Sequence, residues 1–374
     1  MNKTKMKVLV APNSMKGSLN AFEFADVVEK AFFDVSSDFI VRKVPVADGG
    51  DFTGEVLCRA LNAVPVEVEV KDPLGRLVQS KYAKIGQKAI IEMADASGIK
   101  LLRSNELNPM ETSSFGTGQL IRAALKDGCT EILLGVGGSA TVDGGLGMLA
   151  ALGYKLIDEQ GRMLEGKGGS LRFVKKIEPP ALVENFTVNI ICDVHNPLLG
   201  KNGAAAVFGP QKGATPEMVG ELEAGLANWA GVLENQCGKD FSGVEGAGAA
   251  GGIVLPLLAC CNAKIVPGAA FVLNQLNFQE HVNWADVVIT GEGKLDGQTL
   301  CDKAPKAVAD VAREQKKPVF AIGGTVTGEA TDAFDGIFSM IPGPISLEEA
   351  MSRSGEMLYQ FSFEFAKLIR AMRF

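Results

Sequence analysis

The stretch ADVVITGEGKLD, residues 285–296, decides the fold class that this sequence predicts. Its first half is apolar and rich in valine and isoleucine, which predicts a strand that enters a hydrophobic core. Its second half contains two glycines, two acids and a lysine, and open α/β sheets bind ligands where strands end in this way. Glycines let the backbone approach a phosphate, lysine neutralises its charge, and carboxylates bind Mg²⁺ or accept a proton. The stretch therefore predicts a ligand site at the end of a strand.

Outward from this stretch, both ends of the chain predict alternating strands and helices. The N-terminal part predicts a strand at 7–11, a helix opened by the capping box NAFE (20–23), a strand at 40–46 and a helix at 52–61. This β-α-β-α order is typical of a parallel sheet. It returns in the C-terminal third, where we expect strands at 285–290, 318–322 and 336–340, a helix at 304–315 and a final helix opened by SLEE (346–349).

The middle of the chain has a different pattern. Residues 66–70, 77–85 and 88–93 alternate or run apolar between short turns, which predicts an antiparallel meander. Helices at 116–127 and 216–236 and strands at 131–134 and 187–192 follow, and the second helix is expected to have Thr215 as its cap and to end near Gly238. At 374 residues the chain is also too long for one ordinary core. We therefore expect a Rossmann-like parallel-sheet α/β domain, residues 1–65 and 280–374, with a second mixed α/β domain, residues 66–279, inserted into it.

Composition limits the partners of the chain. Apolar residues make up 47% and charged residues 22%, as in soluble globular proteins, and a net charge of −7 without a basic stripe argues against nucleic acid. The seven cysteines form no CxxC pair, which favours a reducing cytoplasm over disulfides or zinc. The apolar runs at 8–11 and 253–261 are too short for a signal peptide and a membrane span, respectively. The sequence does not fix the oligomeric state, and a homodimer is one assembly that it allows.

Two N-terminal loops carry candidate site residues. APNSMKGS (11–18) places Ser14 and Lys16 before a predicted helix, where anions are favoured, although a solvated lysine is the simpler interpretation of this loop alone. VADGGD (46–51) follows the second predicted strand. Its Asp48 suits a metal or a hydroxyl, and it suits a helix cap equally well.

The segment GVGGSATVDGG (135–145) is the richest in glycine. Five glycines with Ser139, Thr141 and Asp143 predict an open nest of backbone donors. The segment also matches GxGxxA after a strand, and Asp158 lies at about the spacing of a ribose-binding acid, which leaves a dinucleotide cofactor open. A helix start this rich in glycine is unusual for that motif, so we favour a phosphate or substrate loop.

Two further segments offer a base and another lysine. Asp193 in CDVHNP (192–197) follows a predicted strand, where its carboxylate is well placed to receive a proton from a hydroxyl. We expect the neighbouring His195 to face solvent or to pack. FGPQKG (208–213) then adds Lys212 on a glycine loop.

Two motifs resemble nucleotide-binding loops only in part. GRMLEGK (161–167) has glycine where a P-loop has Ser or Thr, so it predicts a hairpin turn. GAGAAG (246–251) is a formal GxGxxG without a clear preceding strand. It therefore predicts close packing or a second loop of backbone donors.

Taken together, these segments resemble the bacterial glycerate kinase family, the type that phosphorylates glycerate without a P-loop. The resemblance is carried in chain order by APNSMKGSL (11–19), VPVADGGDFT (44–53), TSSFGTGQLI (112–121), GVGGSATVDGGLGMLAALG (135–153), CDVHNPLLGKNGA (192–204), FGPQKGA (208–214), GAGAAGG (246–252) and VITGEGKLDGQTL (288–300). The chain departs from the family pattern at Asn13, where the family has Asp, at Asp51-Phe52, where it has Glu-Gly, at Val142, where it has Asn, and at Asp302, where it has Gly.

The resemblance implies that ATP, with Mg²⁺, phosphorylates a hydroxyl of D-glycerate, with 2-phosphoglycerate as the favoured product and 3-phosphoglycerate as the alternative. It implies Asp193 as the base, with Asp48, Lys16 and Lys294 as further catalytic residues. Asp48 and Asp296 would bind the metal. The substrate or phosphate would be bound by Ser14, Gly137, Gly138, Ser139, Thr141, Asp143, Lys212, Gly291, Glu292 and Gly293.

The resemblance further implies that the site lies in a cleft between the two domains, which a hinge motion would close to exclude water. Two other functions remain open. One is a nicotinamide-dependent oxidoreductase that uses residues 135–140 and Asp158. The other is a non-catalytic sugar-acid sensor, against which the three carboxylates of Asp48, Asp193 and Asp296 argue, because anion binding alone calls for cations and N–H donors.

Overall fold

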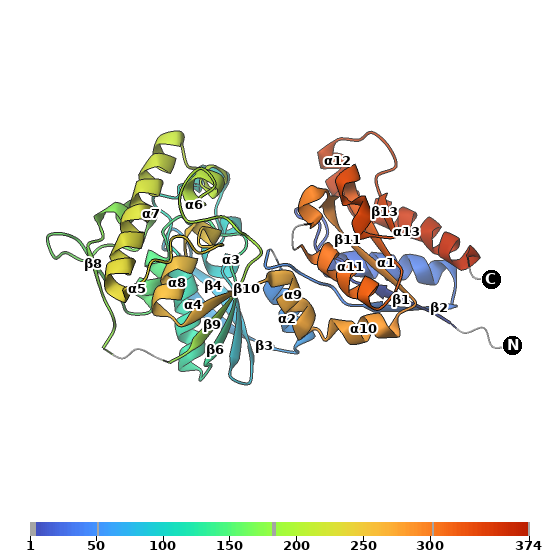
Figure 1. Cartoon of the computed structure of the whole chain (residues 1–374), viewed down its shortest axis with the longest axis horizontal. Coiled ribbons are helices and arrows are strands. Elements are labelled where there is room, and N and C mark those ends of the chain that lie inside the picture. The colour runs from blue at the N-terminus through green and yellow to red at the C-terminus, as the bar shows by residue number, and fades with distance from the viewer. Residues whose placement is uncertain (1–4, 51, 182–184, 301–302, 373–374) are drawn as a thin grey trace. The chain divides into compact units, whose positions relative to one another are not determined.

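A computed structural model describes residues 5–50, 52–181, 185–300 and 303–372 of the chain. The chain divides into two compact units, each described by itself: unit 1 is Met1–Val56 with Pro267–Phe374, and unit 2 is Leu57–Val266 (Figure 1). The sequence placed the two boundaries at 65/66 and 279/280. Both boundaries lie earlier in the structure, at 56/57 and 266/267. The second does so because α9 (Gly268–Gln275) contributes Leu273 to a core of unit 1.

The sheet of unit 1 has five strands, all parallel, in the order β13-β12-β11-β1-β2. The strands are β1 (Met6–Val10), β2 (Phe39–Lys43), β11 (Val287–Leu295), β12 (Val319–Val326) and β13 (Gly336–Ser339). Neighbouring residues of a strand point to opposite faces, so Val288 belongs to one buried core and Ile289 to the other. The expected parallel-sheet α/β fold is confirmed.

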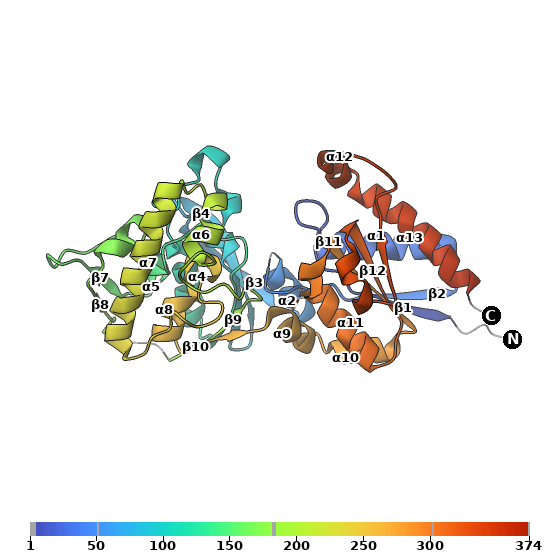
Figure 2. The ribbon, with the colours of Figure 1, turned by 45° about the horizontal axis from the view of Figure 1, so that its top comes forward.

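Helices cover both faces of this sheet. On one face α1 (Ala21–Val35) packs against α13 (Ser354–Ala371), as Figure 2 shows. The capping box that opens α1 is present, because Asn20 and Glu23 each accept a hydrogen bond from the other's backbone N–H. The other helices of this unit are α9, α10 (Phe278–Trp284), α11 (Ala304–Glu314) and α12 (Leu347–Ser352), and α2 (Thr53–Ala60) crosses the boundary between the units.

The strand β11 is longer than the sequence predicted. Its pairing with β12 continues through Glu292–Gly323 and Lys294–Thr325 to Leu295–Val326, so most of the glycine-rich segment stays in the sheet. Glycine at 291 fits this packing, because a Cβ there would lie 2.2 Å from the carbonyl oxygen of Ile322. The two glycines among charged residues predicted that the strand ends near residue 290, but paired with β12 they continue it to Leu295.

The order of the strands in unit 1 marks where a ligand should bind. The chain leaves β1 through α1 to β2 on one side, and it leaves β11 through α11 to β12 on the other side. The neighbouring strands β1 and β11 are therefore the point where the direction of winding reverses. Open parallel sheets bind ligands beyond the carboxyl ends of the strands at this position.

Unit 2 is built on a six-stranded mixed sheet in the order β10-β9-β6-β5-β4-β3. Strands β3 (Val64–Lys71), β4 (Leu77–Ile85) and β5 (Lys88–Glu92) form the predicted antiparallel meander. Strands β6 (Glu131–Gly135), β9 (Thr187–Ile191) and β10 (Ala263–Val266) extend it in parallel. A separate two-stranded antiparallel sheet is formed by β7 (Lys155–Ile157) and β8 (Lys176–Glu178).

The helices of unit 2 surround one large core. They are α3 (Ala94–Ser97), α4 (Phe115–Lys126), α5 (Leu146–Ala151), α6 (Ala204–Phe208), α7 (Pro216–Cys237) and α8 (Val254–Cys260). The long helix α7 has the predicted ends, with Thr215 as N-cap and a left-handed Gly238 after its last residue. Its Trp229 is fully buried in the core. Among the described residues, no helix is both long and apolar enough to span a membrane.

Candidate functional site

In unit 1, the segments that follow β1 and β2 meet the strand β11. The backbone N–H of Asn13 donates to the carbonyl oxygen of Gly291 at 2.8 Å, and the Thr290 hydroxyl donates to that of Ala11 at 2.8 Å. The N–H of Val46 donates to the carbonyl oxygen of Pro12 at 3.0 Å. The loops that the sequence selected in unit 1 therefore lie together at the reversal point of the sheet.

Asp48 is fixed by two donors in this group. Its Oδ2 accepts a hydrogen bond from Asn13 Nδ2 at 3.0 Å, and its Oδ1 accepts one from the Gly50 N–H at 3.2 Å. Asn13 is buried, and its own side-chain oxygen accepts from the Ser14 N–H at 2.8 Å. An ionised aspartate at position 13 could not donate to Asp48, so the departure from the family pattern supplies a hydrogen bond that the usual residue would not. Of the other departures, Val142 is fully buried in unit 2, Phe52 lies on the surface, and Asp51 and Asp302 are outside the described residues.

Glu292 is the most perturbed acid of unit 1. Its side chain is 6% exposed, and its Oε1 accepts a hydrogen bond from the Thr299 hydroxyl at 2.7 Å. Burial raises the pKa of the Glu292 carboxyl to about 7, the carboxylates of Asp48 and Asp296 add to the rise, and Thr299 and Lys303 oppose it. The sequence marked Glu292 only as a substrate or phosphate ligand and assigned no role to Thr299. The sequence signal for Thr299 was its position in GEGKLDGQT (291–299), three residues after Asp296, within the same segment as Glu292.

The two basic residues predicted for unit 1 are at its surface. Lys294 Nζ lies 2.7 Å from Asp296 Oδ2, and the two side chains are 63% and 14% exposed. The Asp296 N–H donates to the Thr299 hydroxyl at 3.0 Å, which links this ion pair to Glu292. Lys16 is exposed on the loop before α1. The lysines can therefore reach an anion in solution.

The acids of unit 1 are suited to Mg²⁺ by their chemistry. Hard cations take oxygen ligands, and Mg²⁺ is commonly held by one or two carboxylates together with water and substrate phosphates. Asp48 and Asp296 supply such oxygens. Within the described part of the chain, no three His, Cys, Asp or Glu side chains gather closely enough to form a metal site made of protein alone. Two carboxylates completed by a nucleotide's phosphates fit this finding.

In unit 2, the glycine segment 135–145 leaves the sheet at the end of β6. Its backbone pairs with the segment before α4, where the Ile99 N–H donates to the carbonyl oxygen of Gly138 and the Ala140 N–H donates to that of Ser97, both at 2.9 Å. Gly138 has a φ of +65°, which turns the chain in a way that favours glycine. Gly137 and Gly138 are half-buried, so this turn is the accessible part of the segment.

Asp143 anchors the far end of this segment. The fully buried carboxylate accepts hydrogen bonds from the N–H and the hydroxyl of Ser114, both at 2.7 Å, and from the N–H groups of Gly145 at 3.1 Å and Gly147 at 3.2 Å. Burial raises the pKa of Asp143, and these hydrogen bonds oppose the rise. The sequence marked Asp143 as a ligand and assigned no role to Ser114, although TSSFGTGQLI, which contains Ser114, carried part of the family resemblance.

Lys212 is buried instead of lying exposed on its glycine loop. Its side chain is 2% exposed, and its Nζ donates to the Ser139 hydroxyl at 2.8 Å and to the carbonyl oxygen of Thr141 at 2.7 Å. Burial lowers the pKa of Lys212 to about 7, and the negative charge of Asp143 opposes the shift. Lys212, which the sequence predicted as a substrate or phosphate ligand, therefore contacts the glycine segment from the protein interior.

The predicted base, Asp193, follows β9 and is half-buried. The loop GAGAAG packs against both this segment and the glycine segment, since the Gly248 N–H donates to the carbonyl oxygen of Asn196 and Gly251 accepts from the Gly144 N–H, each at 3.0 Å. Close packing, one of its two predicted roles, is therefore what this loop shows. His195 pairs at the surface with Glu245, 2.9 Å away.

Asp158, the candidate ribose-binding acid of a dinucleotide site, is hydrogen-bonded within its own turn. Its Oδ2 accepts from Arg162 Nε at 2.8 Å, and its Oδ1 accepts from the N–H groups of Gln160 at 2.9 Å and Arg162 at 2.8 Å. These bonds form a tight turn at residues 158–162, between the bridged residues Ile157 and Met163, and this turn overlaps the start of GRMLEGK, where a hairpin turn was predicted. The carboxylate is buried by its own turn and is not presented to a ribose.

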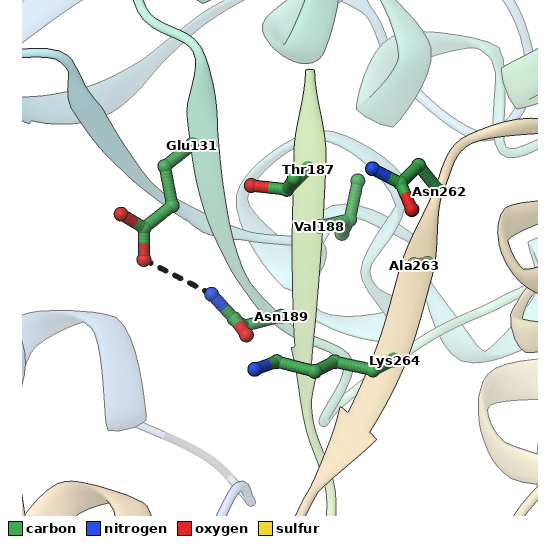
Figure 3. Close-up of a pocket in the computed structure, with 7 residues that line it drawn as sticks. All are labelled: Glu131, Thr187, Val188, Asn189, Asn262, Ala263 and Lys264. Atoms are coloured by element: carbon green, nitrogen blue, oxygen red, sulfur yellow. Dashed lines mark hydrogen bonds between the residues drawn. The ribbon is translucent and has the colours of Figure 1, made fainter.

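A separate pocket lies at the opposite end of the strands of the unit 2 sheet from the glycine segment. It has a volume of about 280 Å³ and is lined by Glu131, Thr187, Val188, Asn189, Asn262, Ala263 and Lys264 (Figure 3). Glu131, Thr187 and Ala263 begin β6, β9 and β10, so the pocket lies at the amino ends of these parallel strands. The glycine segment and Asp193 follow the carboxyl ends, and none of the predicted site residues lines this pocket.

Comparisons with known proteins cover almost the entire chain. Residues 8–370 match the sequence profile of the glycerate kinase family. A glycerate kinase of Halalkalibacterium halodurans is 41% identical over 94% of this chain and 95% of its own length. A glycerate 2-kinase of Escherichia coli is 41% identical over 92% of this chain and 93% of its own length. A glycerate kinase 2 structure from Salmonella typhimurium LT2 superposes with a TM-score of 0.84 at 40% identity and covers 98% of this chain and 99% of that one.

Proposed function

This chain belongs to the glycerate kinase family and is a kinase, and we propose that it transfers the γ-phosphoryl group of ATP to a hydroxyl of D-glycerate. We further propose 2-phosphoglycerate as the product, because the Escherichia coli relative is a glycerate 2-kinase. Six free thiols among the described cysteines fit the reducing cytoplasm in which we expect the enzyme to act on these two small molecules.

The observation that carries the proposal is the meeting of strand ends in unit 1. Asp48 and Asp296 are close enough to Glu292 for their charges to raise its pKa, and the Lys294 ammonium pairs with Asp296. Phosphoryl transfer requires positioning and neutralisation of spread negative charge more than covalent catalysis. A site with both oxygen ligands for a cation and exposed lysines suits this chemistry, whereas a site that only binds an organic anion has no need of clustered acids.

In this proposal the groups of unit 1 handle the charge of the transferred group. Mg²⁺, held by Asp48 and Asp296, would neutralise phosphate oxygens when bound with ATP. Lys16 and Lys294 neutralise the transferred phosphoryl group or the carboxylate of glycerate. Asn13 keeps the Asp48 carboxylate oriented through its 3.0 Å hydrogen bond. Ser14, Gly291 and Gly293 line the same strand ends.

The groups of unit 2 handle the acceptor and its proton. Asp193 accepts the proton of the attacking hydroxyl, a role that needs little perturbation when the transition state is loose. Backbone N–H groups of the turn at Gly137, Gly138 and Ser139 bind an anionic part of a substrate. In the same segment, Asp143 fixes the path toward α5 by accepting from the N–H groups of Gly145 and Gly147, and the Thr141 carbonyl oxygen accepts from Lys212.

An ADP-release assay with a panel of hydroxy acids tests this proposal. We expect release that depends on D-glycerate and Mg²⁺ and is much weaker with L-glycerate or lactate. Asp193→Asn should lower kcat about 10²–10⁴-fold with a small change in KM, the usual effect of losing a general base. Glu245→Gln, at the surface pair of His195, is the matched control and should leave kcat unchanged.

Two outcomes would contradict the proposal. Binding of glycerate or ATP without any turnover would favour the non-catalytic sensor. Binding of NAD(H) in place of ATP, with hydride transfer to or from a hydroxy acid, would favour the oxidoreductase. The hydrogen bonds that occupy Asp158 weigh against the second outcome.

A further inference from the structure

Lys212 combines deep burial with hydrogen bonds to two buried residues of the glycine segment, Ser139 and Thr141, next to its half-buried turn at Gly137 and Gly138. Granting the kinase function proposed above, we propose that Lys212 is a positioning residue that fixes residues 137–141 from the protein interior, so that their backbone N–H groups are held ready for an anionic group of a substrate. This differs from a direct phosphate ligand, which the sequence suggested, because the ammonium contacts the segment on its buried side.

The hydrogen bonds divide the segment into used and unused groups. Lys212 donates to the Ser139 hydroxyl and the Thr141 carbonyl oxygen. The Gly138 carbonyl oxygen accepts from the Ile99 N–H, and the Ala140 N–H donates to the Ser97 carbonyl oxygen. Within the described residues, no protein group accepts a hydrogen bond from the N–H groups of residues 137–139. Three successive N–H groups around a left-handed glycine form the kind of nest that binds anions.

The charge of Lys212 lacks a direct counterion. In the described part of the chain no ion pair joins its Nζ to a carboxylate, and Asp143 is the one titratable group whose charge acts on it. The other groups facing it are neutral: the Ser139 hydroxyl and the Thr141 carbonyl oxygen. The Thr141 hydroxyl is also fully buried and has no hydrogen-bond partner in the described residues. An anion on the nest would supply the missing negative charge.

Proton uptake by Lys212 on ligand binding distinguishes this role from simple structural support. The pKa of Lys212 is lowered to about 7, so at pH 8 most of the side chains are neutral before a ligand binds. An anion nearby favours the charged form and raises the pKa, so binding at pH 8 should draw in up to one proton. At pH 6 the side chain is already charged, and binding should draw in almost none.

Calorimetric titration with D-glycerate and, separately, with ADP measures this uptake in two buffers of different ionisation enthalpy. We expect the wild-type protein to take up a fraction of a proton with one of these ligands at pH 8 and to lose this uptake at pH 6. Lys212→Met should abolish the uptake and raise the KM of the corresponding substrate, D-glycerate or ATP, about tenfold or more. Lys212→Arg should bring this KM most of the way back to the wild-type value. Lys175→Met removes an exposed lysine of the same unit and should behave as the wild type.

Other results would overturn the assignment. A wild-type protein that takes up no proton with either ligand contradicts it, and this test holds even if Lys212→Met does not fold. A folded Lys212→Met with the wild-type KM for both ATP and D-glycerate contradicts it as well. Absence of glycerate-dependent ADP release in the wild type would instead count against the kinase function, so the two failures can be told apart.

Discussion

The two glycine-rich segments of this protein are held in place in different ways. In unit 1, residues 291–295 remain in a strand, and pairing with β12 gives them their rigidity. In unit 2, residues 136–145 leave the sheet, and buried charged side chains hold them in place, Lys212 near one end and Asp143 at the other. In unit 1 the exposed Lys294 pairs with Asp296, whereas in unit 2 Lys212 and Asp143 are buried and bond to hydroxyl and backbone groups. A glycine-rich strand end therefore does not by itself say which charges are available to a ligand.

Removing the Asp143 carboxylate should produce the largest loss of stability. Asp143→Ala leaves the buried donors of Ser114, Gly145 and Gly147 without an acceptor, so we expect unit 2 to lose about 3–5 kcal/mol of unfolding free energy. Asp296→Asn in unit 1 disturbs an ion pair with an exposed lysine and should cost about 1 kcal/mol or less.

Urea unfolding can follow the two units separately. The chain has two tryptophans, so the buried Trp229 reports on unit 2 in a Trp284→Phe background, and Trp284 reports on unit 1 in a Trp229→Phe background. Equal losses for Asp143→Ala and Asp296→Asn would remove the contrast between the two segments.

Adding a methyl group should also separate the two units. A Cβ at Gly251 would lie 2.0 Å from the Thr141 carbonyl oxygen on a backbone with φ +73°, so Gly251→Ala should cost about 2–4 kcal/mol. A Cβ at Gly293 would lie 3.6 Å from the Met15 Cα, an ordinary contact, so Gly293→Ala should cost about 1 kcal/mol or less. Thermal unfolding of both variants measures this, and a tolerated Gly251→Ala would show that GAGAAG does not constrain the glycine segment.

Above neutral pH, Lys212 should dominate the difference between wild type and Lys212→Met. The pKa of this lysine is lowered in the fold to about 7 from an ordinary value of 10.5, so between these limits the unfolded chain binds more protons than the folded one. Wild-type stability relative to Lys212→Met should therefore rise by about 1 kcal/mol per pH unit from pH 7 to 10. Parallel stability curves in urea over this range would contradict the burial of a titrating lysine.

Below neutral pH, Glu292 should show the opposite trend. Its pKa is raised to about 7 from an ordinary value of 4.5, so the stabilising proton is present in full below pH 4.5 and is lost as the pH rises through 7. Wild-type stability relative to Glu292→Gln should fall by about 1 kcal/mol or less per pH unit across this window. Urea unfolding between pH 5 and 7.5 tests the slope, and a rise in place of a fall would mean that Glu292 is stabilised as an anion.

The sequence was informative where local pattern determines structure. Alternating strands and helices predicted the parallel sheet, and the caps of α1 and α7 were predicted at the residues that form them. It failed where a distant partner decides. The strand was expected to end at residue 290, because nothing local shows that β12 pairs with Gly291 and Gly293, and α9 was placed in the inserted domain because its core partners are far away in sequence.

The candidate site shows the same division. Asp48, Glu292 and Asp296 were recognised from strand ends, and the structure brings them together with Asn13 and Thr299. The burial of Lys212 could not be predicted, because a lysine on a glycine loop is usually solvated. Its partners, Ser139 and Thr141, lie about seventy residues earlier in the chain.

Phosphorus NMR of the reaction product tests the central claim most directly. The purified protein is incubated with Mg-ATP and D-glycerate, and the proton-coupled spectrum is recorded as ADP accumulates. We predict a new phosphomonoester signal split into a doublet by the single proton at C2, which identifies 2-phosphoglycerate. A triplet from the two protons at C3 would keep the kinase but move the site of transfer to the other hydroxyl. Consumption of ATP with release of inorganic phosphate alone, or no consumption at all, would contradict glycerate phosphorylation.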